Sequence, residues 1–203
     1  LKTMKIDTYE KLIDQVYDHK PLIKLYLIGE PTLHKQLCEM IQYAHNRGCT
    51  TMIHTNATML TRELASQIID SKLDYISFSF DAATPEIYEK SRIGAKYENV
   101  LNNILGFLDV KLSKAEKTPQ TILDIIKMKE TESHLDKFVK FWDRPGVDEV
   151  HIQPYMTWVD EVEDRRSKAK NTLGFKPCDA LFNTTAILSN GVVVPCCMDV
   201  EGK

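Results

Sequence analysis

Short apolar segments alternate with segments of helical periodicity along most of the chain. The apolar segments are rich in β-branched and aromatic residues and are bounded by glycine or polar residues, which is typical of buried strands. Such strands lack the strict alternation of a sheet with one solvated face, so we expect both faces of the sheet to be covered. Strands are predicted over residues 22–28, 50–55, 74–80, 121–128 and 147–153.

Helices are predicted between these strands from apolar stripes and from local capping signals. Asp7-Thr-Tyr-Glu10 resembles a capping box, and Thr32 is expected to cap the second helix, which ends at Gly48. Pro85 is expected at the first position of a later helix. Further helices are predicted over residues 61–70, 96–114 and 135–142.

Strands that are each followed by a helix indicate parallel pairing through right-handed crossovers. The predicted fold class is therefore α/β. An open doubly wound sheet and a partial barrel both satisfy this pattern, and both place ligand sites at the carboxyl ends of the strands.

The texture of the chain changes after the last of these strands. Residues 160–170 are dense in charge and are interpreted as a linker or a solvated helix. Two short apolar runs, 184–188 and 192–194, are joined by Ser189-Asn190-Gly191, a strong hairpin signal. We therefore divide the chain into an α/β domain (1–158), a linker (159–176) and a small second module (177–203).

Composition excludes several classes of protein. The chain has 203 residues, 43% of them hydrophobic and 27% charged, with a formal net charge of −3, so it lacks the basic footprint of a nucleic-acid-binding protein. No apolar run approaches a membrane span and no signal peptide is visible, so we expect a cytoplasmic protein with no membrane partner. Five cysteines without a secretory signal argue against a disulfide framework; Cys38 and Cys49 are interpreted as small core or surface residues.

Polar side chains recur where successive strands end. Taken singly, Glu30, Asn56 and Asp81 are ordinary turn residues. Together they offer carboxylates, hydroxyls and an amide with few fixed cations, which suits a ligand with an amine and several hydroxyls, and Glu30 is the natural partner of the amine. The complete set is Gly29-Glu30-Pro31, His54-Thr55-Asn56, Ser77-Phe78-Ser79-Phe80-Asp81, Lys127 and His151-Ile152-Gln153-Pro154-Tyr155.

Three of these segments resemble the radical S-adenosylmethionine (SAM) enzymes: Gly29-Glu30-Pro31, Thr55-Asn56-Ala57 and Ser79-Phe80-Asp81, in this order and at this spacing. The resemblance covers nearly the whole chain and includes the Lys-Met-Lys-Glu-Thr-Glu-Ser step after Ile126. It implies a partial (β/α)6 TIM-like barrel of parallel strands, of which the five predicted strands are the second to the sixth.

The resemblance also implies a SAM pocket. Gly29, Glu30 and Pro31 would bind the methionine amino group, Thr55 and Asn56 would line the same pocket, and Ser79 would lie near the ribose or carboxylate. The remaining assignments are Arg92, which would hold the SAM carboxylate or else be a solvated charge at a helix end, and Asp81, which would shape the site or face the substrate.

The Cys-x3-Cys-x2-Cys loop that holds the SAM-cleaving four-iron, four-sulfur (4Fe-4S) cluster in this family does not occur in the sequence. Because the chain begins where a helix after that loop should begin, we expect that an N-terminal piece precedes Leu1. Such a fragment alone could not cleave SAM.

The C-terminal cysteines resemble the opening of a SPASM domain, the auxiliary iron–sulfur module of one branch of the family. Cys178 is followed after twelve residues by Gly191 and after four more by Cys196. The resemblance implies that Cys178 and Cys196 bind an auxiliary iron–sulfur cluster, whereas Cys197 is too close to Cys196 to share the metal easily. A pair of buried hairpin cysteines or an incomplete zinc knuckle is the alternative.

The activity implied is reductive cleavage of SAM to a 5′-deoxyadenosyl radical, which abstracts hydrogen from a peptide or protein substrate, with flavodoxin or ferredoxin as the electron donor. A dehydrogenase or epimerase acting on a sugar or alcohol is one alternative, and a non-catalytic binding module with a zinc hairpin is another. A metal-dependent barrel hydrolase would need ligands such as His54, Asp81 and His151. Candidate substrate contacts without an assigned role are Lys127, Gln153, Tyr155 and Trp158.

Overall fold

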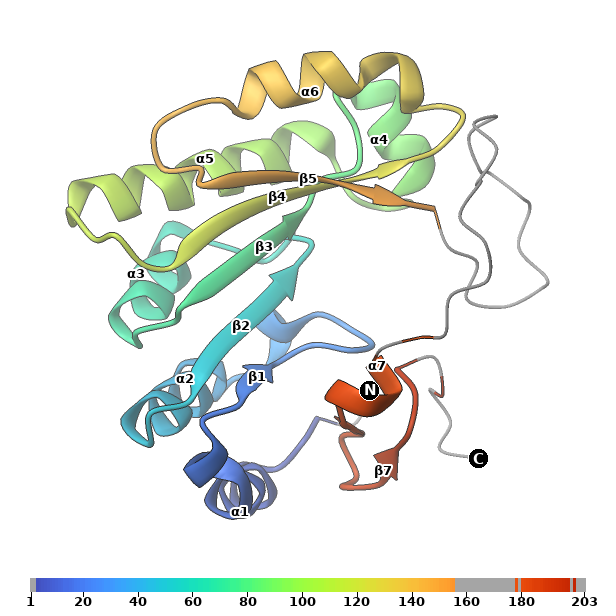
Figure 1. Ribbon diagram of the computed structural model, residues 1–203. Coiled ribbons are helices and arrows are strands. Elements are labelled where there is room, and N and C mark those ends of the chain that lie inside the picture. Colours follow the sequence, from blue (N-terminus) through green and yellow to red (C-terminus); the bar gives the residue numbers. More distant parts are fainter. Residues whose placement is uncertain (1–2, 156–177, 179, 198, 200–203) are drawn as a thin grey trace.

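A five-stranded parallel sheet forms the centre of the computed structural model, which describes residues 3–155, 178, 180–197 and 199. The strands lie in sequence order, so every crossover runs in the same direction and the sheet curves into a partial barrel (Figure 1). The strands are β1 (Leu22–Lys24), β2 (Thr50–Thr55), β3 (Tyr75–Ser79), β4 (Gln120–Lys127) and β5 (Glu149–Pro154).

Helices cover the outer, convex face of this sheet, as Figure 1 shows. The α-helices are α1 (Ile6–Val16), α2 (Leu37–Asn46), α3 (Arg62–Asp70), α4 (Pro85–Ser91), α5 (Tyr97–Ser113) and α6 (Leu135–Trp142). Short 3-10 turns are η1 (Tyr17–His19), η2 (Pro31–Leu33) and η3 (Glu132–His134). Among the residues described, no helix is both long and apolar enough to cross a bilayer.

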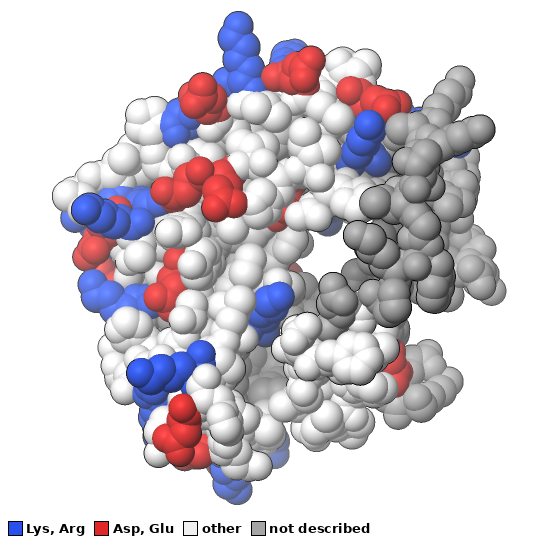
Figure 2. All heavy atoms as spheres, viewed as in Figure 1, with Lys and Arg blue, Asp and Glu red and all other residues white. Residues whose placement is uncertain are grey.

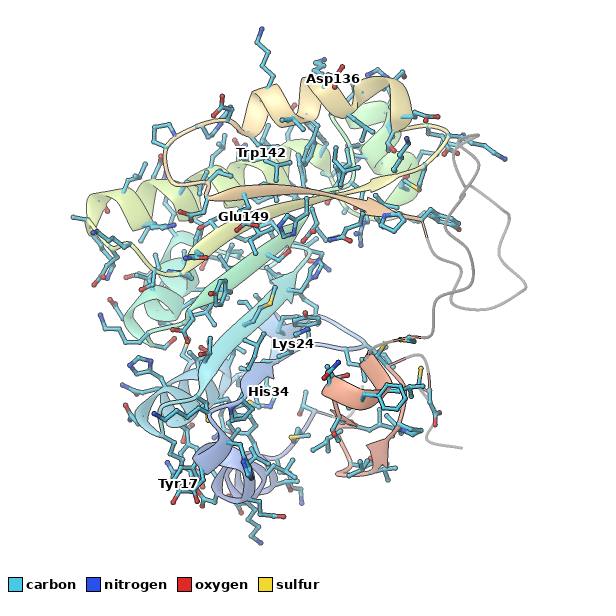
Figure 3. All side chains as sticks on the ribbon, viewed as in Figure 1. Tyr17, Lys24, His34, Asp136, Trp142 and Glu149 are labelled. Atoms are coloured by element: carbon cyan, nitrogen blue, oxygen red, sulfur yellow. The ribbon has the colours of Figure 1, made fainter. Side chains whose placement is uncertain are left out.

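The hydrophobic core lies between the helices and the convex face of the sheet. Phe80 lies at the centre of this core and is 1% exposed. The centroid of its ring lies 5.0 Å from that of Tyr88, 5.0 Å from that of Tyr97 and 5.7 Å from that of Trp142. Trp142 points from α6 toward the sheet (Figure 3). This aromatic cluster fixes the end of β3 and therefore the segment that carries Ser79 and Asp81.

The opposite, concave face of the sheet is polar. Strand register places the side chains of His54, Ser77 and Glu149 in one row across this face and those of Asp124 and His151 in the next row of the same face. Lys24 of β1 and Glu149 of β5 mark the two borders of this face in Figure 3. Helices α1 to α6 of the described residues lie on the other side of the sheet and leave this polar face to ligands.

Three sequence predictions are corrected by the structure. The first strand is shorter than predicted, because Leu25 donates a last ladder bond to Met52 and the chain then leaves the sheet. Asp7 lies in the first turn of α1, whose N-cap is Lys5, so no capping box forms. Thr32 does not cap α2, because residues 31–33 form η2, and Gln36 is the N-cap.

The predicted hairpin near the C-terminus is confirmed. Strands β6 (Ala186–Ile187) and β7 (Val193–Val194) pair antiparallel after the short helix α7 (Ala180–Asn183). Gly191 has a φ of +86°, which explains the glycine in the turn, and a Cβ built there would lie 3.8 Å from Thr8 of α1. The hairpin turn therefore lies against the first helix. The predicted linker, 159–176, and Trp158 lie outside the described residues.

Cys38 and Cys49 behave as the sequence predicted. Cys49 is 4% exposed in a small core formed with α1 and α2, and Cys38 packs at the border of the main core. Both thiols are free, and burial raises the pKa of each.

Candidate functional site

The carboxylate of Glu30 is held at the carboxyl edge of the sheet by residues of the neighbouring strand. Its Oε1 accepts hydrogen bonds from the Thr55 hydroxyl at 2.5 Å and from the hydroxyl and backbone N–H of Thr32 at 2.6 and 3.0 Å. Its Oε2 accepts one from the backbone N–H of Asn56 at 2.8 Å. The sequence prediction that Glu30, Thr55 and Asn56 converge agrees with this geometry.

All four donors to Glu30 are uncharged, and no Lys or Arg pairs with it within the described part of the chain. These hydrogen bonds orient the carboxylate, but no cationic side chain among the described residues neutralises its charge. Three donors converge on Oε1 and one on Oε2, which leaves Oε2 the freer acceptor. This arrangement suits a cationic N–H donor from a ligand.

Backbone conformation places this carboxylate. Gly29 has a φ of +103°, which only glycine adopts without strain, and it turns the chain just before Glu30, in the segment that follows β1. Pro31 then begins η2 with its fixed φ. On the neighbouring strand, the Thr55 hydroxyl also accepts from the Ala57 N–H at 3.0 Å, which fixes the loop that follows β2.

A second polar group follows β3. The Arg92 guanidinium, at the end of α4, donates from Nε to Asp81 Oδ2 at 2.8 Å, and its Nη2 contacts both Asp81 and the Ser79 hydroxyl. The Asp81 side chain is 5% exposed and that of Arg92 is 32% exposed. The structure thus unites Ser79, Asp81 and Arg92, and it pairs Arg92 with a carboxylate of the protein itself.

One oxygen of this group lacks a partner. Asp81 Oδ1 is buried and accepts no hydrogen bond within the described residues. A buried carboxylate oxygen without a donor is costly, so the ion pair with Arg92 is what stabilises the Asp81 carboxylate in this position, and Arg92 is the more accessible member of the pair. With the Glu30 carboxylate on the same edge, these residues fit a ligand that carries an ammonium group and hydroxyl groups, as SAM does.

A third polar cluster lies on the concave face; His54, Ser77, His151 and Gln153 were among the polar residues predicted to gather at the strand ends, but its central residue, Asp124, was not. The Asp124 side chain is 8% exposed; it accepts from the Ser77 hydroxyl and, at 3.1 Å, from Gln153 Nε2. His54 Nε2 lies 3.8 Å from one of its oxygens and His151 Nδ1 lies 3.7 Å from the other. The signal available in the sequence was a lone carboxylate inside the apolar run Ile122-Leu123-Asp124-Ile125-Ile126.

Burial alters the ionisation of groups beside this cluster. Burial lowers the pKa of His54 and outweighs the opposing influence of Asp124, so the imidazole is neutral at pH 7. Burial and the nearby Asp124 raise the pKa of Tyr26, whose ring lies edge-on to that of His54 at 5.5 Å. In this cluster the Asp124 carboxylate thus lies between two imidazoles, of which that of His54 is neutral at pH 7.

The described residues do not supply a metal centre. No three His, Cys, Asp or Glu side chains among them are arranged to hold a metal ion. His54, Asp81 and His151 do not form such a group, so the ligands of a barrel hydrolase are not present there. Cys178 is exposed and Cys196 partly exposed in the hairpin module; their assignment as cluster ligands stays a prediction.

The other predicted substrate contacts have partners within the protein. Lys127 pairs with Glu132 at 3.1 Å, and Gln153 joins the Asp124 cluster. Tyr155 follows the last strand and is partly exposed.

Comparisons with known proteins agree with this architecture. The sequence pattern of the Radical SAM superfamily matches residues 2–141. The tungsten-containing aldehyde ferredoxin oxidoreductase cofactor-modifying protein of Pyrococcus furiosus is 26% identical over 152 residues, which are 71% of this chain and 41% of that protein. The PqqA peptide cyclase of Bradyrhizobium diazoefficiens is 32% identical over 79 residues, 39% of this chain and 21% of that protein.

Among solved structures, SuiB of Streptococcus suis superposes with a TM-score of 0.73 at 15% identity, over 94% of this chain and 53% of SuiB. This likeness concerns the fold. The chain spans about half the length of SuiB, and less than half of the curated relatives above.

Proposed function

The chain belongs to the radical SAM superfamily, and from this we propose that it forms the SAM-binding barrel of an enzyme that modifies a peptide or protein. The observation that carries the proposal is the carboxylate of Glu30, oriented by four uncharged donors at the edge of the barrel. The methionine ammonium of SAM is the partner that this carboxylate lacks among the described residues.

When bound, SAM and the 4Fe-4S cluster would supply the radical chemistry that removes a hydrogen atom from the substrate. The residues of this chain contribute binding and orientation. Glu30 holds the ammonium group of SAM, and Thr55 and Asn56 keep the Glu30 carboxylate in place. Arg92 anchors Asp81 and Ser79 and presents its partly exposed guanidinium at the edge of the pocket.

Residues that hold the SAM-cleaving cluster are not found in this sequence, which has no Cys-x3-Cys-x2-Cys loop. Cys178 and Cys196 are our candidates for an auxiliary cluster of the SPASM type, in a small module that begins near residue 177. An electron donor such as flavodoxin or ferredoxin would serve the complete enzyme.

A peptide substrate is supported by the relatives. SuiB was solved bound to SAM and also bound to its precursor peptide SuiA, and the PqqA peptide cyclase bears its substrate class in its name. Figure 2 shows a hollow beside the described part of the sheet. The concave face carries side chains of both charge signs, such as Lys24 on β1 and Glu149 on β5 (Figure 3), which suits a polar peptide better than a nucleic acid.

The test is SAM turnover by the full-length protein purified without oxygen. Bound iron and sulfide, and formation of 5′-deoxyadenosine and methionine on reduction, are the expected results. Zinc in place of iron, with no affinity for SAM, would instead support the non-catalytic binding module and overturn the proposal.

A further inference from the structure

We propose that the cluster of Asp124, His54 and His151 on the concave face binds a primary ammonium group of the substrate. Assigning this group to the substrate rests on the proposed function, because it assumes that the concave face is where the substrate lies. The cluster is separate from the Glu30 and Asp81 groups, which we assign to SAM.

The first support is an unbalanced buried charge. The Asp124 side chain is 8% exposed, and no Lys or Arg lies within 4.0 Å of it in the part of the chain that is described. Its two bonded partners, Ser77 and Gln153, are neutral. A buried carboxylate is strongly disfavoured unless a cation is near, so the site lacks a positive charge.

The lysines and the arginine of the surrounding elements do not supply that charge. Lys127 pairs with Glu132 and Arg92 with Asp81. Lys24 stands on β1, three strands away from Asp124 in the sheet order. On β5, Glu149 adds a further carboxylate to the same face (Figure 3).

The second support is the position of the imidazoles. His54 Nε2 and His151 Nδ1 face Asp124 at 3.8 and 3.7 Å, beyond ordinary hydrogen-bond length. They therefore flank the carboxylate without using up its lone pairs. The other nitrogen of His151, Nε2, lies 2.5 Å from Glu149 Oε2, so a neutral imidazole that donates there presents Nδ1 as an acceptor. A primary ammonium has three N–H donors, and the site offers three acceptor groups: one carboxylate and two imidazoles.

The third support is access. Asp124 is buried, but the side chains of His54 and His151 are 34% and 39% exposed, and Gln153 beside them is exposed. The cluster therefore opens to the hollow of the concave face. A flexible alkylammonium chain reaches such a floor more readily than a bulky group does.

The experiment uses the full-length protein and Nα-acetyl-lysine N-methylamide, which presents a peptide-like lysine side chain. Nα-acetyl-norleucine N-methylamide is the neutral matched ligand, and n-butylamine represents a free small amine. Binding is followed by NMR through the ring C–H signals of His54 and His151, without SAM. We expect the two amines to shift both signals and the norleucine compound to leave them unchanged.

Variants locate the binding. Asp124→Asn should weaken amine binding by about tenfold to a hundredfold, because a charged hydrogen bond becomes a neutral one. Glu30→Gln, which removes the carboxylate assigned to SAM, should leave it within about twofold. If Asp124→Asn does not fold, His151→Gln serves instead, with the His54 signal as the reporter and a smaller loss expected.

The outcomes are distinct. Stronger binding of the lysine compound than of n-butylamine assigns the ammonium to a peptide side chain, and equal binding assigns recognition to the ammonium alone. Amine binding that survives Asp124→Asn but disappears in Glu30→Gln, or norleucine binding equal to lysine binding, overturns the inference. Because SAM is absent from the assay, failure of SAM turnover leaves this result unaffected.

Discussion

Replacing Glu30 by glutamine tests the SAM site with the smallest change of shape. The amide oxygen of the new side chain can take the place of Oε1 and keep its three donors, from Thr32 and Thr55. The amide nitrogen then faces the Asn56 N–H, so one hydrogen bond is lost and the negative charge is removed. The fold should persist while the contact to a ligand ammonium is weakened.

The magnitude follows from that contact. A hydrogen bond to a charged group contributes about 1.5–3 kcal/mol. At about 1.4 kcal/mol for each factor of ten, SAM should bind about 10- to 140-fold more weakly to Glu30→Gln.

The assay is isothermal titration calorimetry on the full-length protein with SAM and with 5′-methylthioadenosine, which retains the nucleoside but lacks the amino acid part. The variant should bind 5′-methylthioadenosine as the unaltered protein does. An equal loss for both ligands would show that Glu30 only maintains the loop, and an unchanged affinity for SAM would refute the assignment of its ammonium to this carboxylate.

Three further predictions concern stability. Phe80→Ala should lower the free energy of unfolding by about 3–5 kcal/mol in urea titrations, since the ring is fully buried among aromatic side chains, and a loss below that of Phe80→Leu would contradict this packing. Burial lowers the pKa of His54, so its contribution to the free energy of unfolding should be constant above about pH 6.5 and should fall below that pH, where the unfolded chain takes up a proton. His54→Gln should flatten this part of the plot of unfolding free energy against pH. An NMR titration midpoint of His54 above about 6.5 would disprove this prediction. Lys111→Met should lower the free energy of unfolding by about 1–3 kcal/mol in the same urea titrations, because the buried Lys111 Nζ bonds to Asp148 at 2.8 Å and to Thr121 at 3.1 Å. A variant as stable as the unaltered protein would show that the pair of Lys111 and Asp148 contributes nothing to stability.

Local sequence signals predicted the elements that are bounded on both sides. The predicted strand at residues 50–55 matches the structure, because Gly48 ends the preceding helix just before it. The predicted helix at residues 61–70 also matches, because the Thr61 side chain caps it by accepting from the Leu64 N–H. The first strand was overestimated because its end is set by its neighbour: pairing with β2 stops at Met52, which the sequence of residues 22–28 does not reveal.

The candidate site was predictable where residues follow strands and unpredictable where they lie within them. Thr55 and Asn56 stand at the end of β2, and Glu30 lies in the segment that follows β1, so parallel pairing predicts that they lie at the same edge of the sheet. The cluster on the concave face depends on the exact register of β3, β4 and β5, which decides that Ser77 and His151 flank Asp124. Periodicity gives the strands but not this register.

The attachment of Glu30 to the second strand has a consequence for how the edge of the barrel opens. The unit formed by α1 and β1 is joined to the sheet by three paired residues and a small core of its own, so it should exchange its amide protons before the rest of the barrel does. A ligand that grips Glu30 holds this unit through Thr55 and Asn56. A bound ligand would then stabilise the edge of the sheet. Amide exchange in α1 would slow by about the ratio of the free ligand concentration to the dissociation constant of the ligand.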